Sequence, residues 1–187
     1  GNLRYLQYFV PDDRGDQLSP GEYLTQIVAK VTNHPLITTH LNSVLVNTSG
    51  FKGNFESRIK TNGEITEVNH GVIIVATGGI EYKGTEYGYG QDERIVTQLE
   101  FEQILAQRDQ DSSIESVVMV QCVGPAEKYC SRLCCTTALK NALKIKEKNP
   151  DTRVSIIYKD IRTYGFKERI YTQAREAGVV FIHYEFD

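Results

Sequence analysis

The chain has 187 residues, of which 40% are hydrophobic and 24% charged, and its 21 lysines and arginines against 24 aspartates and glutamates give a net charge of −3. This composition is ordinary for a globular protein and excludes a collagen-like, coiled-coil or disordered chain. A dedicated nucleic-acid-binding protein would carry a basic surplus, so we expect no nucleic-acid partner. An apolar run of about 18 residues and a signal-peptide layout are both missing, so we expect no membrane insertion and a cytoplasmic location.

The first part of the chain predicts a helix followed by short strands. Residues 20–33 place apolar side chains on one helical stripe, and Pro20 suits the first turn. Alternating β-branched residues are typical of strands, and Asn62-Gly63 is a strong hairpin turn signal. The predicted strands cover residues 37–48, 55–60 and 64–68. The run GVIIVATGG over residues 71–79 predicts a further strand that is buried on both faces.

The last part of the chain predicts a parallel α/β unit. A predicted helix over residues 97–108 is followed by a polar break at 109–113. Strands are then predicted over residues 117–121, 154–159 and 179–184, with helices over 136–148 and 166–177. This β-α-β-α-β order with short connections predicts half of a doubly wound, Rossmann-like parallel sheet over residues 117–187.

All four cysteines lie between Cys122 and Cys135, in the turn after the first of these strands. A Rossmann half usually has a G-x-G-x-x-G phosphate loop there, but this turn has one glycine, so ordinary NAD binding is not expected. Four thiolates in one loop can supply all the ligands of an iron–sulfur cluster. Cys134 and Cys135 are adjacent, which suits two irons of a cubane better than one tetrahedral zinc. Zinc, a disulfide formed on oxidation and simply buried cysteines remain open alternatives.

The stretch VVMVQCVGPAEKYCSRLCCTTALKNALKIKE and the following IIYKDIRTYGFKERIYTQAREAGVVFIHYEFD closely resemble the A subunit of heterodisulfide reductase and its bacterial FAD/iron–sulfur relatives. The segments HPLITTHLNSVLVNTSGFKGNF, GVIIVATGG and YGYGQDERIVTQLEFEQIL extend the resemblance over nearly the whole chain. The cysteine motif is highly specific, whereas the ATG strand is shared by many two-domain flavoproteins. The resemblance implies a thioredoxin-reductase-like flavoprotein core that carries FAD, exchanges electrons with four-iron clusters and works with other redox subunits.

The resemblance also implies roles for individual residues. A four-iron (4Fe-4S) cluster is implied on Cys122, Cys130, Cys134 and Cys135, although the family interval between the first two cysteines is often longer than the seven residues found here. Lys140 is implied to lie near the flavin, with Glu100 as the first candidate for its acidic partner. The residues implied to approach FAD are Ala76, Thr77 and Gly78.

One departure from the family pattern is large. The FAD phosphate loop would lie upstream of Gly1, and neither it nor the C-terminal ferredoxin modules occur in the sequence. We therefore expect an internal fragment of a longer enzyme, with a partial FAD-binding α+β segment over residues 1–112 and the cysteine-bearing Rossmann-like half over 113–187. We expect weak or absent FAD binding and no activity in the fragment alone. The alternative function is a non-enzymatic, zinc- or disulfide-stabilised docking module of a redox complex.

Overall fold

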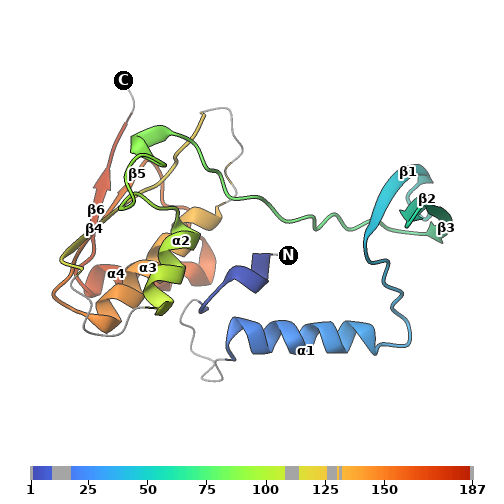
Figure 1. Ribbon diagram of the computed structural model, residues 1–187, viewed down its shortest axis with the longest axis horizontal. Coiled ribbons are helices and arrows are strands. Elements are labelled where there is room, and N and C mark those ends of the chain that lie inside the picture. The colour runs from blue at the N-terminus through green and yellow to red at the C-terminus, as the bar shows by residue number, and fades with distance from the viewer. Residues whose placement is uncertain (1, 10–17, 108–113, 126–129, 131, 186–187) are drawn as a thin grey trace. The chain divides into compact units, whose positions relative to one another are not determined.

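The computed structural model describes residues 2–9, 18–107, 114–125, 130 and 132–185 (Figure 1). The chain divides into two compact units, one over Tyr23–Gly79 and one that combines Asn2–Glu22 with Ile80–Asp187. The first unit is therefore an insertion within the sequence of the second. The predicted domain boundary between residues 112 and 113 falls outside the described residues and stays a prediction.

Helix α1 (Pro20–Thr32) confirms the first predicted helix. A capping box fixes its start: the Ser19 hydroxyl accepts a hydrogen bond from the Glu22 backbone N–H at 3.2 Å, and the Glu22 carboxylate accepts one from the Ser19 N–H at 2.8 Å. Pro20 then occupies the first helical position, where its missing N–H is not needed.

Three antiparallel strands pair in the order β1 (Ser43–Phe51), β2 (Asn54–Thr61) and β3 (Glu64–His70). Asn62 and Gly63 both have positive φ, 50° and 98°, as a two-residue primed hairpin turn requires. The predicted strands over 55–60 and 64–68 are thus confirmed. The strand predicted to begin at residue 37 begins at Ser43 instead, because residues 37–42 form no ladder.

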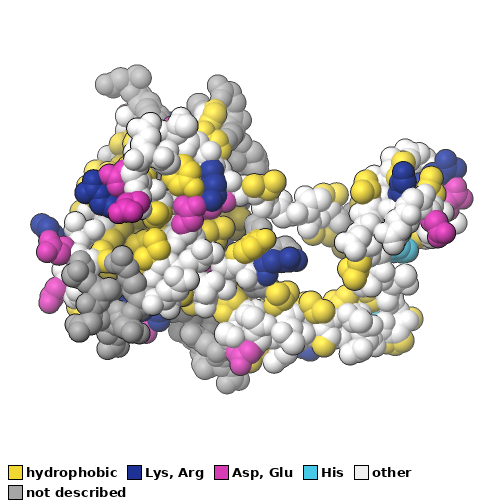
Figure 2. All heavy atoms as spheres, in the orientation of Figure 1, with side chains coloured by type: hydrophobic (Ala, Val, Ile, Leu, Met, Phe, Trp, Pro, Cys, Tyr) yellow, Lys and Arg dark blue, Asp and Glu magenta, His cyan; other side chains and the backbone are white. Residues whose placement is uncertain are grey.

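The prediction of a buried strand over residues 71–79 is wrong. In the structure this segment is extended but pairs with no strand among the described residues, and it is exposed throughout. Val72, Ile74 and Val75 keep 69%, 86% and 79% of their surface accessible, and Figure 2 shows hydrophobic side chains at the surface along this segment. A strand exists only through its ladder partner, and an apolar run in the sequence does not say whether that partner is present.

The second unit contains the predicted parallel sheet. Its strands are β4 (Ser116–Val120), β5 (Arg153–Tyr158) and β6 (Val180–His183), in the order β4-β5-β6 and all parallel. The helices are α2 (Gln98–Gln107), α3 (Leu133–Lys148) and α4 (Glu168–Glu176), and the 3-10 turns are η1 (Asn2–Tyr5), η2 (Glu86–Gly88) and η3 (Gly165–Lys167). The β-α-β-α-β order confirms the predicted α/β class and the Rossmann-like half.

One core lies between this sheet and its helices. Helix α3 contributes Leu139 and Ala142, which are fully buried against Ile156 of β5 and neighbouring apolar residues. The other face of the sheet is open among the described residues, since Val118 and Val180 keep 60% and 53% of their surface exposed. None of the helices in the described ranges is long and apolar enough to cross a bilayer.

Candidate functional site

The cysteine loop connects the carboxyl end of β4 to the first turn of α3, and both of its ends have unusual backbone. Gln121 extends the β4 ladder by donating its N–H to the Ile157 carbonyl at 2.8 Å. Cys122 then turns the chain with φ of 61°, and Arg132 caps α3 with φ of 61°. A left-handed conformation costs a non-glycine residue about 1–2 kcal/mol, and such strain is concentrated at functional sites.

The other three cysteines act electrostatically on the Cys134 thiol. Cys135 is buried, while Cys122, Cys130 and Cys134 are partly exposed, and none is in a disulfide. The hydrogen bond between the two adjacent thiols raises the pKa of Cys134, and burial and the charges of Cys135, Cys130 and Cys122 raise it further. The same hydrogen bond lowers the pKa of Cys135 to about 6, although burial opposes this. Of these two adjacent thiols Cys135 therefore ionises more readily, and the thiolate is the form that binds metal.

The four thiols are a donor set that could hold an iron–sulfur cubane, one thiolate for each iron. Among the described residues, no three His, Cys, Asp or Glu side chains converge closely enough to hold one ion. An iron–sulfur cubane does not need this convergence, because each thiolate binds a different iron at a different corner. The first turn of α3, with its positive dipole end, carries Cys134 and Cys135 and favours an anionic group.

The loop after β5 supplies a second set of contacts to the cysteine loop. The Arg162 backbone N–H lies 3.5 Å from the Cys135 sulfur, and the Asp160 carbonyl oxygen lies 3.7 Å from it. The side chains of Asp160 and Arg162 form an ion pair at 2.7 Å. The Arg132 guanidinium lies 5.9 Å from the centre of the Tyr164 ring. The sequence places this loop at the carboxyl edge of the sheet but gives no sign of its contact with Cys135.

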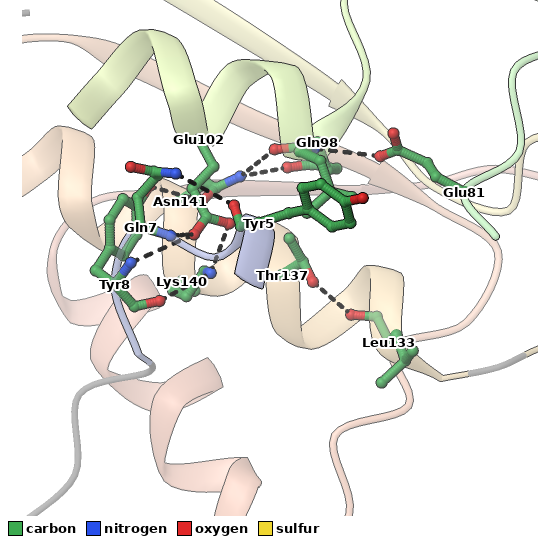
Figure 3. A network of polar contacts seen from close by, with 11 residues as sticks. Tyr5, Gln7, Tyr8, Glu81, Gln98, Glu102, Leu133, Thr137, Lys140 and Asn141 are labelled. Atoms are coloured by element: carbon green, nitrogen blue, oxygen red, sulfur yellow. Dashed lines mark hydrogen bonds and ion pairs between the residues drawn. The ribbon is translucent and has the colours of Figure 1, made fainter. Parts of the chain in front are cut away.

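A buried ion pair lies one helical turn beyond the cysteines. Lys140 Nζ is 2.7 Å from the Glu102 carboxylate, and their side chains are 5% and 0% exposed (Figure 3). Lys140 also donates to the Tyr8 carbonyl at 3.1 Å and lies 4.7 Å from the centre of the Tyr8 ring. Burial lowers the pKa of Lys140, and the Glu102 carboxylate partly opposes that effect. Lys140 is thus a buried cation rather than a solvated helix residue.

Backbone and amide groups complete the network around this ion pair. The Gln7 and Tyr8 N–H groups donate to Glu102 Oε1 at 2.6 and 3.4 Å. The Tyr8 hydroxyl donates to Asn141 Oδ1 at 2.7 Å, and Asn141 Nδ2 donates to Gln98 Oε1 at 2.8 Å. Figure 3 shows these side chains between the N-terminal segment, α2 and α3. The network therefore joins three segments that are far apart in the sequence.

Glu100 does not contact Lys140 but caps α2. Its carboxylate accepts hydrogen bonds from Lys83 at 2.6 Å, the Tyr89 hydroxyl at 2.9 Å and the Thr97 N–H at 2.8 Å. Burial opposes ionisation, but these hydrogen bonds outweigh it and lower the pKa of Glu100 to about 2. The acidic partner of Lys140 does come from the predicted helix, but it is Glu102. The helical phase of α2 could have identified Glu102, because it lies three residues before the buried Leu105 and therefore shares its face of the helix.

The predicted flavin-contacting residues lie in the other compact unit. Ala76, Thr77 and Gly78 belong to the exposed segment that follows β3, and Gly78 has a positive φ of 74°. Their contact with FAD stays a prediction.

Comparison with known proteins confirms the resemblance seen in the sequence. No protein-family model matches the chain. The A subunit of the ferredoxin:CoB-CoM heterodisulfide reductase of Methanosarcina acetivorans is 36% identical over 64% of this chain and 20% of the relative. The iron-sulfur A subunit of the CoB--CoM heterodisulfide reductase of Methanocaldococcus jannaschii is 40% identical over 60% of this chain and 20% of the relative.

A third relative is also named as an A subunit. The A subunit of the H(2):CoB-CoM heterodisulfide,ferredoxin reductase of Methanothermobacter marburgensis is 37% identical over 64% of this chain and 21% of the relative. The chain spans about a fifth of the length of the curated relatives that it matches. These relatives are all named as A subunits of heterodisulfide reductases, and this chain is similar to part of each of them.

Proposed function

We propose that this chain is the cluster-bearing segment of an oxidoreductase that resembles the A subunit of heterodisulfide reductase. Cys122, Cys130, Cys134 and Cys135 would hold one 4Fe-4S cluster, which supplies one-electron transfer when bound. The observation that carries this proposal is the gathering of four free thiols at one strand-to-helix turn, between the end of β4 and the first turn of α3. The M. jannaschii relative is named as an iron-sulfur subunit, which supports the proposal.

In the whole enzyme, electrons would pass between FAD and this cluster. Residues 1–112 would contribute part of the FAD-binding domain, with Ala76, Thr77 and Gly78 near the cofactor, and residues 113–187 would carry the cluster. The partners would be other redox subunits of a heterodisulfide-reductase-like complex, since the relatives are named as single subunits of larger enzymes. The cytoplasm would be its location.

Lys140 would act on the flavin through its charge. A buried ammonium stabilises a nearby anion strongly because little water screens it, so it would favour a reduced, anionic flavin. Glu102 would hold Lys140 in place, and we propose Glu102 instead of Glu100 for the acidic role. Burial lowers the pKa of Lys140, so its Nζ proton is easier to release than that of an exposed lysine.

The test is anaerobic reconstitution of the full chain with iron and sulfide. We expect about four irons and four sulfides per chain and a brown protein. Alanine at Cys130, Cys134 or Cys135 should each strip or degrade the cluster, because each would remove the only protein ligand of one iron. Cys122→Ala should leave a three-iron form, since its spacing matches the family motif least well.

A matched control is Thr152→Val, a buried polar residue at the amino end of β5, which should keep the full iron content. A colourless anaerobic protein with full zinc occupancy would overturn the proposal and support the docking-module alternative. The same conclusion would follow if all four alanine variants kept the wild-type visible spectrum.

A further inference from the structure

Two buried polar side chains beside the cysteine loop have no hydrogen-bond partner among the described residues. Gln121 is 1% exposed and Thr136 is 9% exposed. Both side-chain polar atoms of Gln121 and the hydroxyl oxygen of Thr136 are unpartnered within the part of the chain that the structure describes. Each is adjacent in sequence to a predicted cluster ligand, since Gln121 precedes Cys122 and Thr136 follows Cys135.

The cost of this arrangement indicates that a ligand satisfies it. Burying an amide or hydroxyl without a hydrogen bond costs about 1–3 kcal/mol, so native proteins leave few such groups unpaired. An apolar residue of similar size at either position would avoid that cost. The other buried polar side chains near these helices are partnered, as the Asn141 amide is by Gln98 and the Lys140 ammonium is by Glu102.

The positions of the two residues point to the cysteine loop. Gln121 lies two residues after the buried Met119, so by strand alternation its side chain lies on the helix-covered face of the sheet, at the carboxyl end of β4. Thr136 lies in the first turn of α3, four residues before Lys140. The sulfur of Cys135 already lies 3.5 Å from the Arg162 backbone N–H, so this region presents hydrogen-bond donors to sulfur.

We propose that the Gln121 amide and the Thr136 hydroxyl donate hydrogen bonds to the sulfur atoms of the cluster or of its cysteine ligands. This inference rests on the proposed function. Both residues would be positioning and tuning groups, not ligands. A donor aimed at sulfur stabilises the reduced, more negative cluster more than the oxidised one, and hydrogen bonds to sulfur are one of the factors that set cluster potentials. The pair would therefore raise the reduction potential.

The test compares the cluster potential in the reconstituted full chain with that in Gln121→Leu and Thr136→Val, by redox titration followed by electron paramagnetic resonance. Each variant removes the donor and keeps nearly the same shape. Losing one hydrogen bond to a charged acceptor should change the equilibrium constant for cluster reduction about tenfold, which is a shift of ~59 mV in a one-electron reduction potential. We expect each variant to keep its iron and to shift the potential downward by about this amount.

Thr152→Val is the control for the loss of a buried hydroxyl. The Thr152 hydroxyl donates to the Ile114 carbonyl at 2.8 Å, at the opposite end of the sheet from the cysteine loop. The Thr152→Val variant should leave the cluster potential unchanged. An unchanged potential in both Gln121→Leu and Thr136→Val, with four irons still bound, would overturn the inference and leave buried water as the partner.

The outcomes separate this inference from the proposed function. If the wild-type chain binds no iron–sulfur cluster, both fail together. If the wild type binds the cluster and the variants keep its potential, only the hydrogen-bond assignment fails. Should Gln121→Leu not fold, Gln121→Met gives the same reading, because it too lacks an N–H donor. In the cluster-free form, the Gln121 variants should unfold at the same temperature as the cluster-free wild type or above it, since an unpartnered buried amide has been removed.

Discussion

Replacing Glu102 by glutamine should strongly destabilise the protein. The Glu102 side chain is fully buried and is paired at 2.7 Å with Lys140, which is 5% exposed. The substitution removes the negative charge and leaves the ammonium with neutral acceptors, the Tyr8 carbonyl and the amide oxygen of the new side chain. Breaking a buried pair by removing one partner costs about 3–5 kcal/mol, a large part of a typical folding free energy of about 5–15 kcal/mol.

The measurement is urea unfolding at pH 7, followed by circular dichroism. Glu147→Gln is the matched control on the same structural unit: Glu147 pairs with Lys144 at 2.8 Å, but its side chain is 68% exposed. That control should stay within about 0.5 kcal/mol of wild type. If Glu102→Gln also stayed within about 1 kcal/mol of wild type, the pair would not be desolvated and the reasoning would be refuted.

The pH dependence of the same pair has a defined sign. Burial lowers the pKa of Lys140 in the folded protein below its ordinary value of 10.5. Between the folded and unfolded pKa values the unfolded chain therefore binds more protons, and stability rises with pH through that window. Lys140→Met should lose this rise, so the wild-type stability advantage should grow as pH approaches 10.5. A difference that does not vary with pH would contradict the lowered pKa.

Three further outcomes are expected. The folded pKa of Glu100 is about 2 instead of 4.5, so its contribution to stability should be present above pH 4.5 and be lost as pH falls toward 2. The Glu100→Gln variant should lack this acid transition when unfolding is followed by circular dichroism. Gly50→Ala should destabilise the three-stranded unit by at least about 1 kcal/mol in thermal melts, because the added Cβ would lie 2.2 Å from a carbonyl oxygen of the facing strand, whereas Gly21→Ala should not. Tyr8→Phe should cost about 1 kcal/mol in urea unfolding by removing the hydroxyl that donates to Asn141 at 2.7 Å.

Local patterns in the sequence predict most of this fold. The helices and strands of the parallel unit follow from apolar periodicity, and the hairpin follows from Asn62-Gly63, because each depends on residues close in sequence. The segment over residues 71–79 was predicted wrongly, because burial and pairing depend on what lies beside it. The same limit applies to residues 37–42, which carry β-branched side chains but have no ladder partner among the described residues.

The candidate site is likewise predictable from the sequence only in part. The cysteine loop is predictable, since its four thiols lie within one turn. The helical phase of α2 is enough to predict that Glu102 faces the core. No local pattern predicts the role of Tyr8, because the contact between Tyr8 and Asn141 spans 133 positions of sequence. Nothing in residues 2–9 alone indicates that their backbone covers a buried carboxylate. Gln121 gave no signal either, since an unpaired amide is recognised only once its surroundings are known.

The discontinuous second unit has a consequence for the order of events during synthesis. Gln7 and Tyr8 leave the ribosome long before α3, and at about 5–20 residues per second the 133-residue interval to Asn141 corresponds to roughly 10 s of translation. The three-stranded unit over Tyr23–Gly79 makes its ladders within that interval, and a hairpin needs only about 1–10 μs. Glu102 is synthesised next, and Lys140 follows 38 residues later. Until Lys140 has been made, the nascent chain holds the Glu102 carboxylate without the cation that pairs with it in the folded structure.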